Sequence, residues 1–141
     1  MKEIITYLMF DGNAREAMEL YQGALGGELH VMTFGESGQG GPEVAHRVMH
    51  AKLASGTWAL MGSDTMGGGP MTVGNNFSVA LTCESVEEQD RLYSALGEGG
   101  KATMPLQDTF WGARFGMLTD RFGVDWMLNF DHPRPAAQAG A

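Results

Sequence analysis

Two histidines in the first half of the chain are the side chains best suited to acid–base chemistry. His46 and His50 stand four residues apart in the segment VAHRVMHAKL, which is typical of a β-strand. Because side chains alternate along a strand, both would share one face, directed toward a binding cleft or solvent. At about 3.3 Å per residue they would be roughly 13 Å apart, too far to bind one metal ion. His46 is predicted either to be a hydrogen-bonded structural histidine or to serve ligand binding or proton transfer, and His50 to be a surface residue.

Aromatic side chains concentrate in the last third of the chain. They would pack in the core and a dimer interface, or they would line an apolar pocket, since small-molecule sites are built from such rings. Trp111 is the first choice for a ligand or interface contact, because it lies between Phe110 and Gly112 at an expected loop or strand edge. The whole cluster comprises Phe110, Trp111, Phe115, Phe122 and Trp126.

Two aspartates and one cysteine have simpler expected roles. Asp64 ends the segment LMGSD and Asp120 begins the turn DRFG, so both are expected to cap turns rather than to catalyse a reaction. Cys83 is the only cysteine, so no internal disulfide can form. A reducing cytosol is the simplest environment for such a chain, and we expect a cytoplasmic protein.

The composition narrows the range of partners. Among 141 residues, 43% are hydrophobic and 18% charged, and the net charge is −8. Scattered Lys and Arg do not form the basic stripe that nucleic-acid binding requires. The N-terminus reads as a strand rather than a signal peptide, and no apolar run approaches the roughly 18 residues of a membrane span. We therefore expect no nucleic-acid partner and no membrane partner.

A helix with clear start and stop signals lies near the N-terminus. Asn13 would cap it, with Glu16 three residues later completing a capping box. Apolar residues then recur at helical spacing up to the segment ELYQGALGG (19–27). The two glycines at its end favour the left-handed conformation that terminates a helix.

The same signals recur later in the chain. The segment RLYSALGEGG (91–100) repeats the Leu-Tyr and Ala-Leu-Gly steps of the first helix. Recurrence of cap, box, tyrosine and glycine stop in one order indicates a duplicated module. The matched pairs are Asn13 with Ser85, Glu16 with Glu88 and Tyr21 with Tyr93, each separated by 72 residues.

Each module is predicted to run β-α-β-β-β, which gives an α+β fold. Strands are expected at 4–10, 28–34, 44–54, 57–62, 77–83, 102–107, 113–119 and 124–130. Three adjacent antiparallel strands and one helix leave a sheet face uncovered, so two modules would form a curved, open mixed-sheet barrel around a cleft. The expected parts are module 1–64, linker loop 65–76, module 77–130 and a flexible tail at 131–141.

This duplicated plan resembles the glyoxalase/bleomycin-resistance/extradiol-dioxygenase superfamily, also called the vicinal oxygen chelate superfamily, and within it the PhnB-like branch. The most specific part of the resemblance is DTFWGARFGMLTDRFGVDWMLNF (108–130). Further matching segments are YLMFDGNAREAMELYQGALGGEL (7–29), VAHRVMHAKL (44–53) and LMGSD (60–64). The resemblance implies a homodimer and, in catalytic members, a divalent metal held by the first and fourth strands of each module.

The metal-ligand positions that the resemblance implies carry unsuitable side chains in this chain. They fall on Thr6, Met61, Ser78 and Met127. Two hydroxyls and two thioethers are a poor site for zinc, nickel, manganese or magnesium. A shift of one residue in register would direct Asp125 inward, and this is the main alternative. We expect no metal and no other cofactor.

Three functions remain open from the sequence. The favoured one is a metal-free small-molecule binding protein, with Thr6, His46, Met61, Ser78, Trp111, Trp126 and Met127 as cleft candidates. The second is a superfamily enzyme, a lyase, isomerase or dioxygenase, with an atypical metal site or His46 as acid/base. The third is a structural homodimer without a ligand. A methyltransferase is disfavoured, because no glycine-rich turn follows the first strand to hold a nucleotide-like cofactor.

Overall fold

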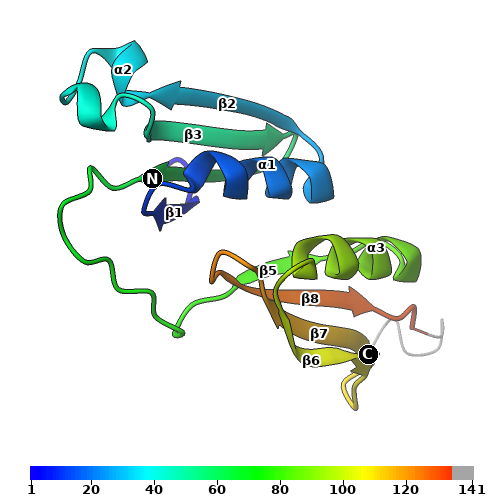
Figure 1. The fold of residues 1–141 in the computed structure, drawn as a ribbon. Helices are drawn as coiled ribbons and strands as arrows, with labels where there is room; N and C mark the ends of the chain where they lie inside the picture. The colour runs from blue at the N-terminus through cyan, green and yellow to red at the C-terminus, as the bar shows by residue number, and fades with distance from the viewer. Residues whose placement is uncertain (135–141) are drawn as a thin grey trace. The chain divides into compact units, whose positions relative to one another are not determined.

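The computed structural model describes residues 1–134 and consists of two compact units, Met1–Gly74 and a second unit that begins at Asn75. Each unit has the predicted β-α-β-β-β order (Figure 1). Each forms one four-stranded mixed sheet, and neither sheet closes on itself. The α+β class and the duplicated module are therefore confirmed. None of the helices among the described residues is long and apolar enough to span a membrane.

The first unit forms a sheet with strand order β1-β4-β3-β2. The parallel pair β1–β4 brings the N-terminal strand beside the last strand of the unit, and the other pairs are antiparallel. Its elements are β1 (Thr6–Phe10), α1 (Ala14–Leu25), β2 (Glu28–Thr33), α2 (Phe34–Ser37), the 3-10 helix η1 (Pro42–Val44), β3 (Val48–Ser55) and β4 (Trp58–Asp64).

The second unit repeats this topology with strand order β5-β8-β7-β6. Here β5 pairs with β8 in parallel, and the hairpin β7–β8 is antiparallel around the predicted turn at Asp120. Its elements are β5 (Val79–Thr82), α3 (Val86–Gly97), β6 (Lys101–Asp108), β7 (Ala113–Thr119) and β8 (Asp125–Asp131). Of the predicted tail, Asp131 belongs to β8, and residues 135–141 lie outside the described part.

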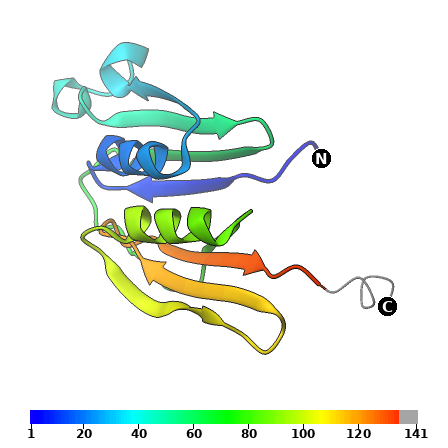
Figure 2. The same ribbon diagram turned by 90° about the vertical axis from the view of Figure 1, so that its right-hand side faces the viewer.

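One helix covers one face of each sheet. Helix α1 packs against β2, β3 and β4, and α3 packs against β7 and β8 (Figure 2). The buried side chains of α1 follow helical spacing, as the sequence predicted, and include Tyr21 and Met18. In the second unit, Trp126 and Leu128 are fully buried on the α3 side of β8. Each unit therefore has its own apolar core between helix and sheet.

The caps of the two helices differ from the predicted pair of capping boxes. Ser85 accepts a hydrogen bond from the backbone N–H of Glu88, as expected. The carboxylate of Glu88 accepts from the N–H of Glu84 rather than from Ser85. Asn13 makes no side-chain capping bond, so the predicted Asn13–Glu16 box is wrong. A capping box does occur at α2, between Thr33 and Glu36.

Candidate functional site

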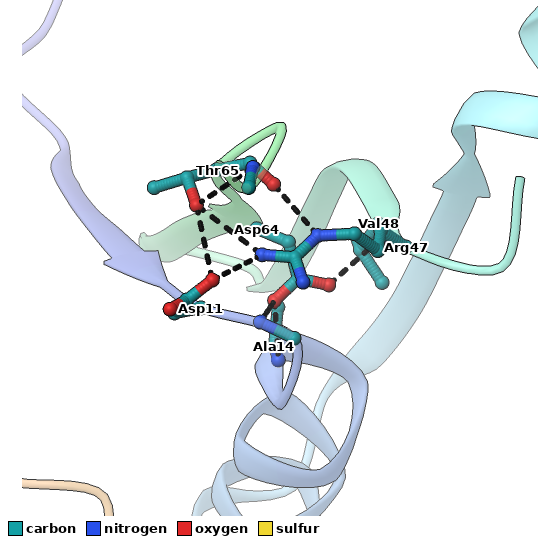
Figure 3. A network of polar contacts seen from close by, with 8 residues as sticks. Asp11, Ala14, Arg47, Val48, Asp64 and Thr65 are labelled. Carbon is teal, nitrogen blue, oxygen red and sulfur yellow. Dashed lines mark hydrogen bonds and ion pairs between the residues drawn. The ribbon is translucent and has the colours of Figure 1, made fainter. Parts of the chain in front are cut away.

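Asp64 takes the capping role that the sequence assigned to Asn13. Its Oδ1 accepts hydrogen bonds from the N–H groups of Gly12 at 2.7 Å and Ala14 at 3.0 Å. Its Oδ2 accepts from the N–H of Val48 at 2.8 Å (Figure 3). A charged carboxylate that satisfies the free N–H groups of a helix start outcompetes a neutral amide there. Asp64 is thus a structural residue, as expected, although it caps a helix rather than a turn.

Arg47 extends this network at the same edge of the sheet (Figure 3). Its Nη2 donates to Asp11 at 2.6 Å and to the Thr65 hydroxyl at 3.2 Å. Its Nε donates to the backbone carbonyl of Thr65 at 2.8 Å. These bonds connect the ends of β1 and β4 to the start of β3. No local sequence pattern indicates this role of Arg47, because its partners lie 18 and 36 residues away.

His46 does not lie in a strand. Pro42 begins η1, and the N–H of Arg47 bonds to the carbonyl of Val44, so a turn replaces the start of the predicted strand. Proline is favoured in the first turn of a helix because its fixed φ fits and its missing N–H is not needed there. β3 begins only at Val48, so the prediction that His46 and His50 share a strand face is wrong. His46 is exposed and lies outside the sheet.

The face of the first sheet opposite α1 carries a group of partly exposed apolar side chains. A side chain at Gly62 would contact Met18 of α1, so the adjacent Met61 points to the opposite face. Met61 pairs in register with Tyr7 and Lys52, which share its face. The other residues that the register places on this face are Met9, Glu28, His30, Met32, His50, Ala54, Ala59 and Ser63.

Tyr7 and His50 interact on this helix-free face. The Tyr7 hydroxyl and His50 Nδ1 lie 3.0 Å apart, and the two rings stack with centroids 5.7 Å apart. The residues belong to β1 and β3, the two strands on either side of β4. The sequence pointed to His46 instead, because the interaction of His50 with a residue 43 positions away leaves no local pattern.

Thr6 and Met61 point to opposite faces, although the sequence placed them in one site. In β1, Leu8 pairs with Gly62 and faces α1, so Thr6 faces α1 as well. In the second unit the residue equivalent to Leu8 is Leu81, because Gly62 and Leu128 hold the same place opposite Ala51 and Gly116, the fourth residues of β3 and β7. β5 is therefore offset from β1 by 73 residues, one more than the 72 of the helices, so Ser78 is not the equivalent of Thr6.

Ser78 and Met127 fall on a common face of the second sheet. Ala80 pairs with Met127, and Ser78 precedes Ala80 by two residues, just before β5. The neighbouring Trp126 is completely buried, and its Nε1 donates to Asp120 at 2.9 Å. Trp126 is thus a core residue, not one of an open site. Asp120 also accepts bonds from two N–H groups of its turn, which agrees with the structural role predicted for it.

Asp125 lies on the same helix-free face as Met127. Its carboxylate accepts a hydrogen bond from the Thr119 hydroxyl at 2.6 Å. No group of three or more His, Cys, Asp or Glu side chains suited to one metal ion occurs among residues 1–134. The side chains nearest to Asp125 in the register are the hydroxyl of Thr119 and the thioethers of Met117 and Met127. These groups do not suit the divalent ions named above.

Trp111 lies in the turn between β6 and β7 and is half exposed. Its ring contacts Phe110 edge to face at 5.0 Å and Phe115 at 6.1 Å. Phe110 is almost fully exposed. The aromatic cluster is thus divided: Trp126 belongs to the core, while Phe110 and Trp111 form an exposed pair.

Cys83 and His132 complete the set of reactive side chains in the second unit. Burial raises the pKa of the Cys83 thiol to about 11, and the Glu88 carboxylate adds to the increase. A thiol with such a pKa is a poor nucleophile near neutral pH. His132 Nε2 lies 2.6 Å from Asp108 Oδ1, a partner that the sequence did not suggest.

Comparisons with known proteins agree with this fold. The family model described as 3-demethylubiquinone-9 3-methyltransferase matches residues 2–129. The crystal structure of protein PA1353 from Pseudomonas aeruginosa is 44% identical, covers 94% of this chain and 100% of that chain, and superposes with a TM-score of 0.87. Protein YjdN from Escherichia coli is 36% identical over an alignment of 143 positions, which covers 92% of this chain and 95% of YjdN.

Two further solved structures share the family or the fold of this chain. The PhnB protein of Bacillus cereus, named for a proposed 3-demethylubiquinone-9 3-methyltransferase activity, is 30% identical over 92% of this chain and 99% of its own, with a TM-score of 0.77. A glyoxalase/bleomycin resistance protein from Albidiferax ferrireducens shares the fold at 18% identity over 92% of this chain and 98% of its own, with a TM-score of 0.59. The chain belongs to the PhnB-like family, whose model is described as 3-demethylubiquinone-9 3-methyltransferase, and has the glyoxalase/bleomycin-resistance fold.

Proposed function

We propose that the chain is a small-molecule binding protein that works without a metal ion, with its ligand on the helix-free face of the first sheet. The observation that carries this proposal is the exposure of Tyr7 (43%), Met9 (51%) and Met32 (47%) on that face. A solvated sheet face normally carries polar residues, and an apolar exposed face indicates a binding surface. Methionine thioethers adapt to ligands of irregular shape.

The experiment is a thermal-shift screen of small apolar metabolites. A ligand that binds only the folded protein at about 100 times its Kd stabilises it by about 2.7 kcal/mol, which raises Tm by several degrees. The variant Met32→Glu should lose this shift, because it places a charge on the binding face. Met66→Glu is the matched control, since Met66 is similarly exposed but lies in the loop after β4. Equal loss in both variants, or no shift with any compound, would contradict the proposal.

The metal-free state is tested by elemental analysis of protein purified without a tag. We expect less than one equivalent of any transition metal per chain. A stoichiometric metal that disappears in Asp125→Ala or His46→Ala would instead support the enzyme alternative. These two substitutions are chosen because they are the two sequence-predicted residues that could restore a ligand set.

Methyl transfer is not adopted as a second function. A nucleotide-like methyl donor needs a helix start with available N–H groups after the first strand. In this chain the Asp64 carboxylate already accepts from Gly12 and Ala14 at that point, and its negative charge disfavours a phosphate or carboxylate there. We expect no heat of binding when the protein is titrated with S-adenosylmethionine.

Assembly as a homodimer is part of the proposal. The exposed pair Phe110 and Trp111 supports it, because exposed aromatic residues are enriched at interfaces. Light scattering coupled to gel filtration should give twice the 15.2 kDa mass of one chain. Replacing Trp111 by Ser would shift the equilibrium toward the monomer, and a monomeric wild-type protein would show that this part is wrong.

A further inference from the structure

We propose that Tyr7 and His50 together form the polar anchor of the ligand site, with Nε2–H of His50 donating to a carboxylate on an otherwise apolar molecule. This inference deepens the proposed function and rests on it. It starts from the 3.0 Å contact between the Tyr7 hydroxyl and His50 Nδ1 and from the stacking of the two rings. Two contacts between the same side chains fix the orientation of the imidazole.

The hydrogen bond also selects the tautomer of His50. A phenol O–H is more acidic than the N–H of a neutral imidazole, and an imidazole nitrogen is more basic than a phenol oxygen. Tyr7 therefore donates and Nδ1 accepts, which leaves the proton of the neutral ring on Nε2. In proteins, the tautomer of a histidine is commonly determined in this way, by the hydrogen bond that the other ring nitrogen makes.

Nε2 of His50 is available to an incoming group. Its hydrogen-bonding capacity is not used within residues 1–134, where the one hydrogen bond of the ring is made by Nδ1. Every buried side-chain nitrogen or oxygen in the described part has a partner. It follows that Nε2 is not buried but reachable from solvent. A donor fixed in orientation and open on one side is suited to bind an acceptor oxygen.

The surroundings of His50 favour an acidic, otherwise apolar ligand. His50 pairs in register with Met32, and Met61 pairs with both Tyr7 and Lys52, so thioethers lie on both sides of the anchor. Lys52 follows His50 by two residues on the same face and adds a positive charge. The one carboxylate that the register adds to this face, Glu28, lies 3.2 Å from His30 at the far end of β2.

The tautomer is tested by nitrogen-15 NMR of histidine-labelled protein at pH 8. We expect His50 to show an unprotonated Nδ1 and a protonated Nε2. In Tyr7→Phe, which keeps the ring stacking, the signals should move toward a mixture of tautomers. Tyr93→Phe removes a hydroxyl that donates to backbone carbonyls of the second unit and should leave His50 unchanged. A protonated Nδ1 in the wild type would overturn the proposal.

The ligand class is tested with three matched probes, 3-phenylpropionate, its amide and 3-phenylpropylamine, in protein with carbon-13 methionine methyl labels. A charge-assisted hydrogen bond corresponds to about tenfold in Kd, so the acid should bind at least about tenfold more tightly than the amine. His50→Phe should reduce this preference by about tenfold, since Lys52 remains, and His50→Gln, whose amide places an N–H near the same position, should restore part of it.

The outcomes separate the two proposals. Equal affinity for acid and amine, with the methyl signals of Met9, Met32 and Met61 shifting in both titrations, would overturn the anchor and leave the binding face intact. A preference for the acid that is undiminished in His50→Phe would also overturn the anchor. If none of the three probes shifts any of these methyl signals, while the thermal-shift screen also finds no compound, both proposals are wrong.

Discussion

At the scale of single residues, the largest structural effect belongs to Asp64. One buried carboxylate accepts three backbone N–H groups, from the loop before α1, from α1 itself and from β3. The sequence could predict that this aspartate is structural, because GSD ends a strand. It could not predict the partners, which lie 16 to 52 residues away, and it therefore assigned the cap to the nearest amide, Asn13.

The two candidates for the cap can be compared directly. Asp64→Ala leaves three N–H groups near the core without an acceptor, so the free energy of unfolding should fall by about 3 kcal/mol. Asn13→Ala removes no capping bond and should change it by less than about 0.5 kcal/mol. Urea denaturation followed by circular dichroism measures both. An equal effect of the two substitutions would show that Asn13 shares the cap in solution.

The thiol of Cys83 gives a prediction that depends on pH. With a pKa of about 11 instead of 9, the folded protein carries about 100-fold less thiolate near pH 8 than the unfolded chain. Reaction with Ellman's reagent should be slower by at least this factor in the folded state and should recover in urea. Because the folded pKa is raised, the stability contribution is complete below pH 9 and is lost as the pH rises through 9 to 11. A rapid reaction in the native protein would contradict the burial of this side chain.

At the scale of elements, the sequence pattern was most informative where structure is local. The helix of residues 14–25, its glycine stop and the hairpin at Asp120 all follow from neighbouring residues. The sequence pattern gave wrong predictions where the structure depends on the register of a strand or on contacts between distant residues. Pro42 starts a 3-10 helix and displaces the start of β3, so His46 leaves the sheet. Counted from equivalent strand residues, the connection from β5 to α3 is one residue shorter than that from β1 to α1, so Thr6 and its supposed equivalent, Ser78, lie on opposite faces of their sheets.

The glycine stop of α1 offers a matched pair of substitutions. Gly26 and Gly27 both have positive φ, but a Cβ at Gly26 meets no atom within 4 Å, whereas a Cβ at Gly27 would lie 2.8 Å from the carbonyl oxygen of Ala54. Gly26→Ala should therefore cost about 2 kcal/mol through backbone strain alone. Gly27→Ala should cost at least about 1 kcal/mol more, because a β3 carbonyl must move. Denaturation midpoints decide the order, and the reverse order would mean that the helix end packs differently against β3.

At the scale of the whole molecule, the chain consists of two units that each bury their own core. Family membership, the fold and the repeat could be predicted from the sequence, because they depend on many residues at once. The composition of the helix-free face of the first sheet could not, since its side chains come from β1, β2, β3 and β4 and their convergence has no linear pattern. The pair Tyr7 and His50 is the clearest example.

The boundary between the units predicts where proteases cut first. The segment 65–77 lies between β4 and β5 and exposes three apolar side chains, Met66, Val73 and Phe77. Thermolysin cleaves before such residues when the backbone is not held in a sheet. Limited digestion should therefore begin in this segment and give two fragments, as identified by mass spectrometry. A first cut before Met9 or Met32, which are exposed but lie in strands, would contradict this assignment.

The origin of the two helix caps sets an order of folding events. α3 is capped by a serine adjacent to it in the chain, so its first turn can be stabilised as soon as that segment collapses. α1 receives its cap from a residue 50 positions further on, and closing so long a loop opposes the contact until β4 is in place. During synthesis the N-terminal helix would thus leave the ribosome well before its cap exists. Substitutions at Ser85 should slow refolding, whereas those at Asp64 should mainly accelerate unfolding.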